Sequence, residues 1–138
     1  MTDNHTINMK LELVPLPVSD VDRAKKFYTD KVGFHMDLDV KPSAGMRIVQ
    51  LTPPGSACSI MIGTGMGDIT DMKPGSFRGL HLVVKDIASA RQALLDRGLD
   101  ISDIQDMGGV LYAYFSDPDG NTWAVQEIRP DAKMPKEA

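Results

Sequence analysis

Residues 115–127 read FSDPDGNTWAVQE, and this stretch predicts two strands joined by a tight turn. Its centre, residues 117–121, consists of Asp, Pro, Asp, Gly and Asn, which are residue types that favour turns. Apolar and aromatic residues flank the turn on both sides, as they do in paired strands. We therefore expect one strand to end near Phe115 and the next to cover residues 122–128.

Outside this hairpin, the chain contains two similar segments. They are residues 13–34, LVPLPVSDVDRAKKFYTDKVGF, and residues 79–99, GLHLVVKDIASARQALLDRGL. At an offset of 66 residues, Val18 aligns with Val84, Asp20 with Asp86, Val21 with Ile87, Ala24 with Ala90 and Asp30 with Asp96. A self-match at one offset that covers a strand, a helix cap and a helix indicates two copies of one structural unit.

Each copy begins with the same order of elements. A short apolar strand, predicted over residues 10–18 in the first copy and 79–84 in the second, runs into an acidic residue that can cap a helix. In the first copy Ser19 and Asp22 also have the spacing of a capping box. Apolar residues then recur with the period of an amphipathic helix, until a glycine in each copy suits the left-handed position beyond a helix end.

Three further strands follow each helix. Alternation and turn residues predict them over residues 34–40, 46–52 and 57–62 in the first copy, and over 99–106, 110–115 and 122–128 in the second. This is a β-α-β-β-β unit repeated twice, and hence an α+β fold.

The two units predict the organisation of the whole chain. We expect a single domain over residues 10–130, with module one at about 10–62, module two at about 79–129, a flexible N-terminal tail at 1–9 and a C-terminal tail at 131–138. Between the modules, residues 63–77 are rich in Gly and Met and have no periodicity. That segment is either a linker or a flexible loop over a pocket.

The composition is that of a globular protein that does not bind nucleic acid. Of 138 residues, 42% are hydrophobic and 25% charged, and the 15 Lys and Arg residues are scattered along a chain of net charge -4. No apolar run approaches the roughly 20 residues of a membrane span. The single cysteine, Cys58, excludes an intramolecular disulfide, and residues 1–10 lack the apolar core of a secretory signal. We expect a cytoplasmic protein.

Three motifs in this order resemble the vicinal oxygen chelate superfamily, which includes glyoxalase I, extradiol dioxygenases and the fosfomycin- and bleomycin-resistance proteins. They are PVSDVDRAKKFYTDKVGF at residues 17–34, LVVKDIASARQALLDRG at residues 82–98 and FSDPDGNTWAVQE at residues 115–127. The resemblance implies two βαβββ modules that form a curved mixed sheet around a cavity. It also implies a homodimer, with the cavity lined by one chain or by two.

In the metal-dependent members of this superfamily, four strands each supply one His or Glu ligand to a divalent ion. Carried over residue by residue, these four positions fall on Leu13, Gly79, Ala124 and Met61, with Ile60 as the alternative to Met61. Leu, Gly and Ala side chains cannot ligate, and a thioether does not suit a hard, oxygen-rich site. We therefore expect neither a metal ion nor another cofactor.

Strand alternation indicates which neighbouring polar residues share the cavity face. Glu12 and Glu127 are out of phase with the four ligand positions, whereas His81 and Gln126 are in phase. His81 is either a general acid or base or a structural histidine bonded within the barrel. Gln126 can hydrogen-bond a ligand carbonyl or a neighbouring strand.

Aromatic and apolar residues complete the predicted ligand site. Tyr112 and Tyr114 share one face of their strand, so both line the cavity or neither does. Leu13 and Met61 supply apolar lining, and Trp123, on the opposite face, is expected to pack under a helix.

Two classes of function fit these residues. The first is a binding protein that holds a small organic or antibiotic-like molecule in a metal-free cavity. The second is a metal-independent isomerase or lyase that uses His81 as acid or base, with Gln126 or a tyrosine orienting a carbonyl. The alternatives are a metal-dependent lyase or dioxygenase with a different ligand register, and an unrelated α+β domain with ferredoxin-like βαβ units.

Overall fold

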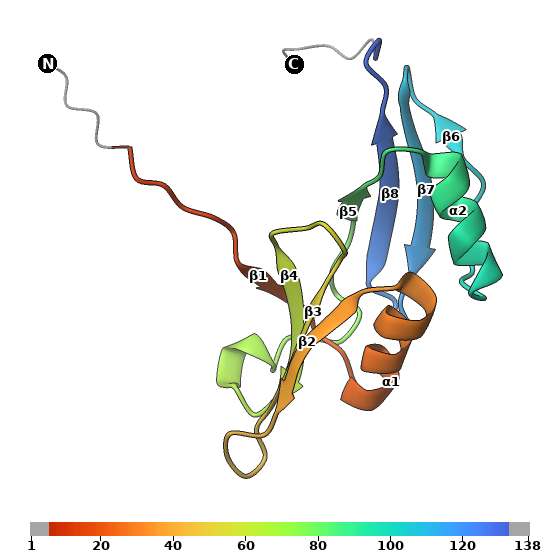
Figure 1. The fold of residues 1–138 in the computed structure, drawn as a ribbon. Coiled ribbons are helices and arrows are strands. Elements are labelled where there is room, and N and C mark those ends of the chain that lie inside the picture. Colours follow the sequence, from red (N-terminus) through yellow and green to blue (C-terminus); the bar gives the residue numbers. More distant parts are fainter. Residues whose placement is uncertain (1–5, 133–138) are drawn as a thin grey trace, which may run out of the picture.

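The computed structural model describes residues 6–132, which form two modules connected by residues 65–79 (Figure 1). Module one contains β1 (Leu13–Pro15), α1 (Val21–Lys26), the π-helical turn η1 (Phe27–Val32), β2 (His35–Val40), β3 (Arg47–Thr52) and β4 (Ser59–Thr64). Module two contains β5 (Leu80–Val83), α2 (Ile87–Asp96), β6 (Gln105–Asp106), β7 (Val110–Ser116) and β8 (Thr122–Ile128). A 3-10 turn, η2 (Gly67–Ile69), lies in the connecting segment.

The two modules have the same topology. Sheet A has the strand order β1-β4-β3-β2, and sheet B has the order β5-β8-β7-β6. In each sheet the first pair, β1 with β4 or β5 with β8, is parallel, whereas the other pairs are antiparallel. The repeated βαβββ unit and the α+β fold expected from the sequence are therefore confirmed. Within residues 6–132, no helix has the length and hydropathy needed to cross a membrane.

Each helix starts and ends as the sequence repeat predicts. The Asp20 side chain accepts a hydrogen bond from the backbone N–H of Arg23 at the start of α1. The Asp86 side chain caps α2 in the same way, through the backbone N–H groups of Ala88 and Ser89. At the other end, Gly33 and Gly98 have φ angles of 91° and 87°, a region that disfavours residues with a Cβ atom.

The capping box predicted from Ser19 and Asp22 is wrong. Asp20 is the N-cap, which leaves Ser19 free to bond another part of the chain. The Ser19 hydroxyl donates to Asp119 in the β7–β8 turn at 2.5 Å, and Asp22 pairs with Arg47 at 2.7 Å.

Two predicted strands are much shorter in the structure. The strand predicted over residues 10–18 is only β1, which pairs with β4 from Leu13 to Pro15; beyond it, Pro17 lacks the N–H that a longer ladder would need. The strand predicted over 99–106 is only β6, since the ladder with β7 covers Gln105 and Asp106; Leu99 and Ile101 pack in the core without pairing in that ladder. Residues 1–5 and 133–138 of the expected tails lie outside the described residues.

The core between the modules is built from aromatic rings. Trp123 packs on Tyr28, Phe34 and Phe115, with ring centroids 5.7 to 6.0 Å apart, and is only 3% exposed. The expectation that Trp123 lies under a helix is confirmed, since Tyr28 belongs to η1. The indole Nε1 donates to the Tyr28 hydroxyl at 2.8 Å, so the polar edge of the ring is satisfied inside the core.

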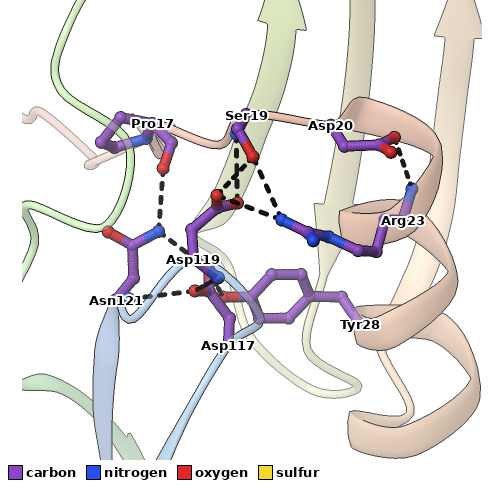
Figure 2. A network of polar contacts seen from close by, with 8 residues as sticks. All are labelled: Pro17, Ser19, Asp20, Arg23, Tyr28, Asp117, Asp119 and Asn121. Atoms are coloured by element: carbon purple, nitrogen blue, oxygen red, sulfur yellow. Dashed lines mark hydrogen bonds and ion pairs between the residues drawn. The ribbon is translucent and has the colours of Figure 1, made fainter.

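A buried carboxylate in the β7–β8 turn connects the two modules (Figure 2). Asp117 accepts hydrogen bonds from four donors: the backbone N–H groups of Asp119 and Asn121, the Asn121 amide, and the Tyr28 hydroxyl of module one at 2.8 Å. The Asn121 amide also donates to the Pro17 carbonyl at 2.8 Å. Burial and the Asp117 charge raise the pKa of Tyr28 well above its usual range, so the phenol stays neutral and can donate.

Replacement of Tyr28 by Phe removes the shared hydroxyl and leaves the Trp123 N–H buried without a partner. We expect Tyr28→Phe to lower the free energy of unfolding by about 1–3 kcal/mol. Urea titration followed by the fluorescence of the single tryptophan measures this loss. The matched control is Tyr114→Phe, on an exposed ring, which should change stability by less than about 0.5 kcal/mol. Equal effects of the two changes would contradict the proposed role of the Tyr28 hydroxyl.

Candidate functional site

The face of sheet B that points away from the helices gathers four of the predicted site residues. Strand register places His81 opposite Ala124, and Ala124 opposite Tyr114. Two residues further along β8 from Ala124, Gln126 lies opposite Tyr112. His81, Tyr112, Tyr114 and Gln126 therefore share one face, which we call the aromatic wall.

The rings of the aromatic wall are arranged as a continuous surface. Tyr112 and Tyr114 stack with their centroids 6.1 Å apart and their planes 7° apart. His81 meets the edge of this pair, 6.0 Å from the Tyr112 centroid at an angle of 86°. Tyr114 is 43% exposed, so a ring face is open to a ligand.

One hydrogen bond determines the tautomer of His81. Its Nδ1 lies 2.5 Å from the carbonyl oxygen of Gly79, and a carbonyl can only accept a hydrogen bond. Nδ1 therefore carries the hydrogen, and in the neutral imidazole Nε2 has the free lone pair. His81 is exposed, so Nε2 is able to meet a ligand as an acceptor or a base.

A depression of about 390 Å³ lies at the end of the aromatic wall. It is lined by Gly79, His81, Tyr114, Phe115, Ser116, Thr122, Trp123 and Ala124. All of these residues belong to module two or to the segment that leads into it. The depression is large enough for part of a drug-sized molecule, although shallow on its own.

The other two predicted lining residues lie on sheet A. Ile60 and Ile62 of β4 belong to the core, so Met61 points to the opposite face, as the preferred register requires. Pro15 and His81 are related by the 66-residue repeat. Pro15 pairs with Met61 in sheet A, and His81 pairs with Ala124 in sheet B. Met61 therefore occupies in module one the position that Ala124 occupies in module two. Leu13 pairs with Ser59 on the same edge. Neither Leu13 nor Met61 borders the depression at the aromatic wall.

Sequence reasoning missed a row of polar residues on this face of sheet A. Ser59 is 5% exposed, and its hydroxyl contacts that of Thr52 at 2.6 Å and accepts from the Gln50 amide at 3.2 Å. Thr52 also bonds Asp37 on β2. The signal was present in the stretch RIVQLT, where Gln50 and Thr52 alternate with two core residues, but only the register across three strands shows that they meet.

A larger hollow, of about 870 Å³, lies between the start of α1 and the β2–β3 loop. Two of its charged side chains form an ion pair, Arg47 with Asp22 at 2.7 Å, and Arg47 also contacts Asp39 at 2.8 Å. Hydrogen bonds from Arg47 and Lys25 hold the pKa of Asp39 well below its usual range. These ion pairs attach α1 to sheet A, so we assign this hollow a structural role.

The side chains do not fit a divalent metal ion. Among residues 6–132, no three His, Cys, Asp or Glu side chains lie close enough together to hold one. At one of the four family ligand positions, Gly79 has a φ angle of 74°, which residues with a Cβ atom rarely adopt. Glu127 points to the helix side, where its carboxylate accepts a hydrogen bond from the Ile87 N–H at 2.8 Å, as strand alternation predicted.

Comparison with known proteins identifies the family. The model of the glyoxalase/bleomycin resistance protein/dioxygenase superfamily matches residues 4–125. This chain belongs to that superfamily. A superfamily relative from Didymella fabae, described as a glyoxylase-like domain-containing protein, is 27% identical over 118 residues, which are 81% of this chain and 88% of the relative.

Solved structures of similar proteins share the fold along most of their length. TnmS3, described as an antibiotic binding protein from Streptomyces sp. CB03234, is 31% identical, with a TM-score of 0.76 over 90% of this chain and 99% of TnmS3. A glyoxalase/bleomycin resistance protein from the same strain is 34% identical, with a TM-score of 0.70 over 84% and 98% of the two chains. A superfamily member from Sphaerobacter thermophilus DSM 20745 is 30% identical, with a TM-score of 0.73 over 87% and 98%.

The residues at the four family ligand positions predict that the protein does not retain a divalent metal ion. After incubation of tag-free protein with nickel, zinc, manganese or iron(II) and desalting, we expect elemental analysis to find well below one metal ion per chain. A metal-dependent superfamily member treated in parallel serves as the positive control. One equivalent retained by this protein would contradict the assignment of Leu13, Met61, Gly79 and Ala124 to those positions.

Proposed function

We propose that this protein binds a small organic molecule of antibiotic type against the aromatic wall, without a metal ion. The observation that carries the proposal is the outer face of sheet B, where two stacked tyrosines, a histidine and an amide converge while the family ligand positions lack donor side chains. The similarity to TnmS3, described as an antibiotic binding protein, supports the same class of ligand.

The aromatic wall can hold a flat, partly polar molecule. A ring system that extends the stack of Tyr112 and Tyr114 gains about 0.5–1.5 kcal/mol per aromatic contact beyond the burial of its apolar surface. The Gln126 amide can donate to a ligand carbonyl, and His81 Nε2 can accept from a ligand hydroxyl. These polar groups orient the ligand, while the rings supply most of the affinity.

We also propose that a homodimer completes the cavity. The aromatic wall is open on the side away from its own helices, whereas Leu13, Met61 and the polar row lie on the other sheet. Because the sheets have the same topology, sheet A of one copy can face sheet B of a second copy across a two-fold axis. Leu13 and Met61 of one copy would then close the ligand site of the other.

We propose that the protein acts in the cytoplasm.

The proposal predicts that a panel of aromatic antibiotics contains a ligand that stabilises chelator-treated protein. At 100 times its Kd, a ligand adds about 2.7 kcal/mol to the free energy of unfolding, which raises the melting temperature measurably. Tyr114→Ala should weaken binding about tenfold, or about 1.4 kcal/mol, by calorimetry, because it removes one aromatic contact. Tyr114→Phe is the matched control and should bind nearly as well as the wild type. A panel with no stabilising compound, or equal affinity in Tyr114→Ala, would count against the aromatic wall.

A second candidate function is a metal-independent isomerase or lyase. The bond from Nδ1 to the Gly79 carbonyl favours it, because it orients Nε2 of His81 as a base beside the aromatic wall. In this scheme Gln126 or a tyrosine orients a ligand carbonyl, and His81 removes a proton next to it.

His81→Asn separates catalysis from binding, since its amide can replace the donor to Gly79 but cannot act as a base. If the protein is an enzyme, we expect the bound compound to be converted by the wild type and conversion to fall by at least about 100-fold in His81→Asn, with binding retained. Mass spectrometry of the recovered compound measures this. An unchanged compound after prolonged incubation with the wild type would leave only the binding function.

A further inference from the structure

Arg97, at the end of α2, carries a positive charge that no carboxylate of residues 6–132 pairs with. The Lys and Arg side chains that form ion pairs within these residues are Arg23, Lys25, Arg47, Arg91 and Arg129. Within the same part of the chain, the Arg97 guanidinium makes one hydrogen bond, from Nη1 to the carbonyl oxygen of Val32 at 3.1 Å. Its Nε and Nη2 groups are therefore available to a ligand.

The backbone of module one holds this guanidinium in place. Besides the bond to Val32, the guanidinium lies directly against Gly33, where an added Cβ atom would collide with Nη1. An arginine whose position is already fixed loses less conformational freedom when it binds an anion. Arg97 is thus prepared for a ligand by a contact between the two modules.

Arg97 also lines an apolar groove of about 290 Å³, which we call the module groove. The groove lies between β5, α2 and the β3–β4 loop, which reaches toward β5 (Figure 1). Of the described residues that line it, Arg97 alone is charged, and the others are apolar, among them Pro54, Val84 and Ala93. Val83, on the rim, is 67% exposed. A concave apolar surface of this size can cover a short hydrocarbon chain.

A second hollow that Arg97 lines, of about 430 Å³, makes the surroundings of the guanidinium positive. One acidic residue, Asp30, lines this hollow, against four basic residues: Arg23, Lys26, Lys31 and Arg97. Arg23 pairs with Asp119 at 3.2 Å, which leaves three cations against one carboxylate in a chain of net charge -4. This local field attracts an anion to the mouth of the module groove and repels a cation.

We propose that the module groove binds a small amphipathic carboxylate of the fatty-acid type. Its carboxylate accepts from Nε and Nη2 of Arg97, which match the two oxygens of one carboxyl group, and its hydrocarbon chain lies in the groove. None of the residues that line the module groove borders the depression at the aromatic wall. The site is therefore separate from the ligand site of the proposed function, and the two proposals stand or fall independently.

The test titrates the full chain, labelled with 15N, with octanoate and follows the backbone amide signals by NMR. We expect saturable shifts at residues 82–84, 93, 94 and 97. Hexanoate should bind about tenfold more weakly, because each methylene group removed lowers the affinity about fourfold. 1-Octanol, which has the same chain without the charge, should bind at least about tenfold more weakly than octanoate.

Three variants test the residues of the site. Arg97→Gln removes the charge and should weaken octanoate binding at least about tenfold. Ala93→Glu introduces a negative charge at an exposed α2 position that lines the groove and should weaken binding to a similar extent. Ala88→Glu, at an exposed position of the same helix outside the groove, is the matched control and should bind as the wild type does. Thermal melting verifies that each variant folds, and Ala93→Glu decides the outcome if Arg97→Gln does not.

Three results would overturn the proposal. Unchanged octanoate affinity in Ala93→Glu and in folded Arg97→Gln, or equal affinity for octanoate and 1-octanol, would limit Arg97 to its structural bond with Val32. Shifts confined to residues 112–114 would place octanoate on the aromatic wall instead of in the module groove. The absence of a saturable shift up to the solubility limit of octanoate would exclude the site, and would not affect antibiotic binding at the wall.

Discussion

The buried carboxylate of Asp117 is the constraint on which the arrangement of the two modules depends. Its four donors come from its own turn and, through Tyr28, from the helical layer of module one. A buried carboxylate that loses one of its hydrogen-bond donors is destabilised by about 1–3 kcal/mol. The carboxylate, the Asn121 amide and the Tyr28 hydroxyl therefore specify one way for the modules to pack.

This packing decides which surfaces are available for function. The helix side of each sheet is used in the shared core, where Trp123, Tyr28 and Phe115 meet. The opposite sides of sheets A and B are the faces that we propose meet the ligand and the second copy. On sheet B this side is aromatic, and on sheet A it carries a polar row between apolar residues.

Local and alternating features of this protein could be predicted from its sequence. Asp20 and Asp86 cap their helices by bonding N–H groups in the first helical turn, so both caps depend only on neighbouring residues. The strand predicted over residues 122–128 agrees with β8. The shared face of His81, Tyr112, Tyr114 and Gln126 follows from the period of a strand once the register is known.

Features that depend on distant partners could not be predicted in this way. Ser19 has the spacing of a cap, but its partner is Asp119, 100 residues away. The Asp-Pro-Asp-Gly turn resembles any tight turn, and its role as the joint between modules depends on the packing of Tyr28. The polar row of sheet A required the register of three strands, which single-strand patterns do not contain.

The decisive experiment is a crystal structure of the protein with the tightest ligand from the antibiotic panel. We expect the ligand to lie against Tyr112 and Tyr114, within hydrogen-bond distance of His81 or Gln126, with no metal ion between protein and ligand. A ligand bound in the charged hollow beside α1, or held through a metal ion, would contradict it.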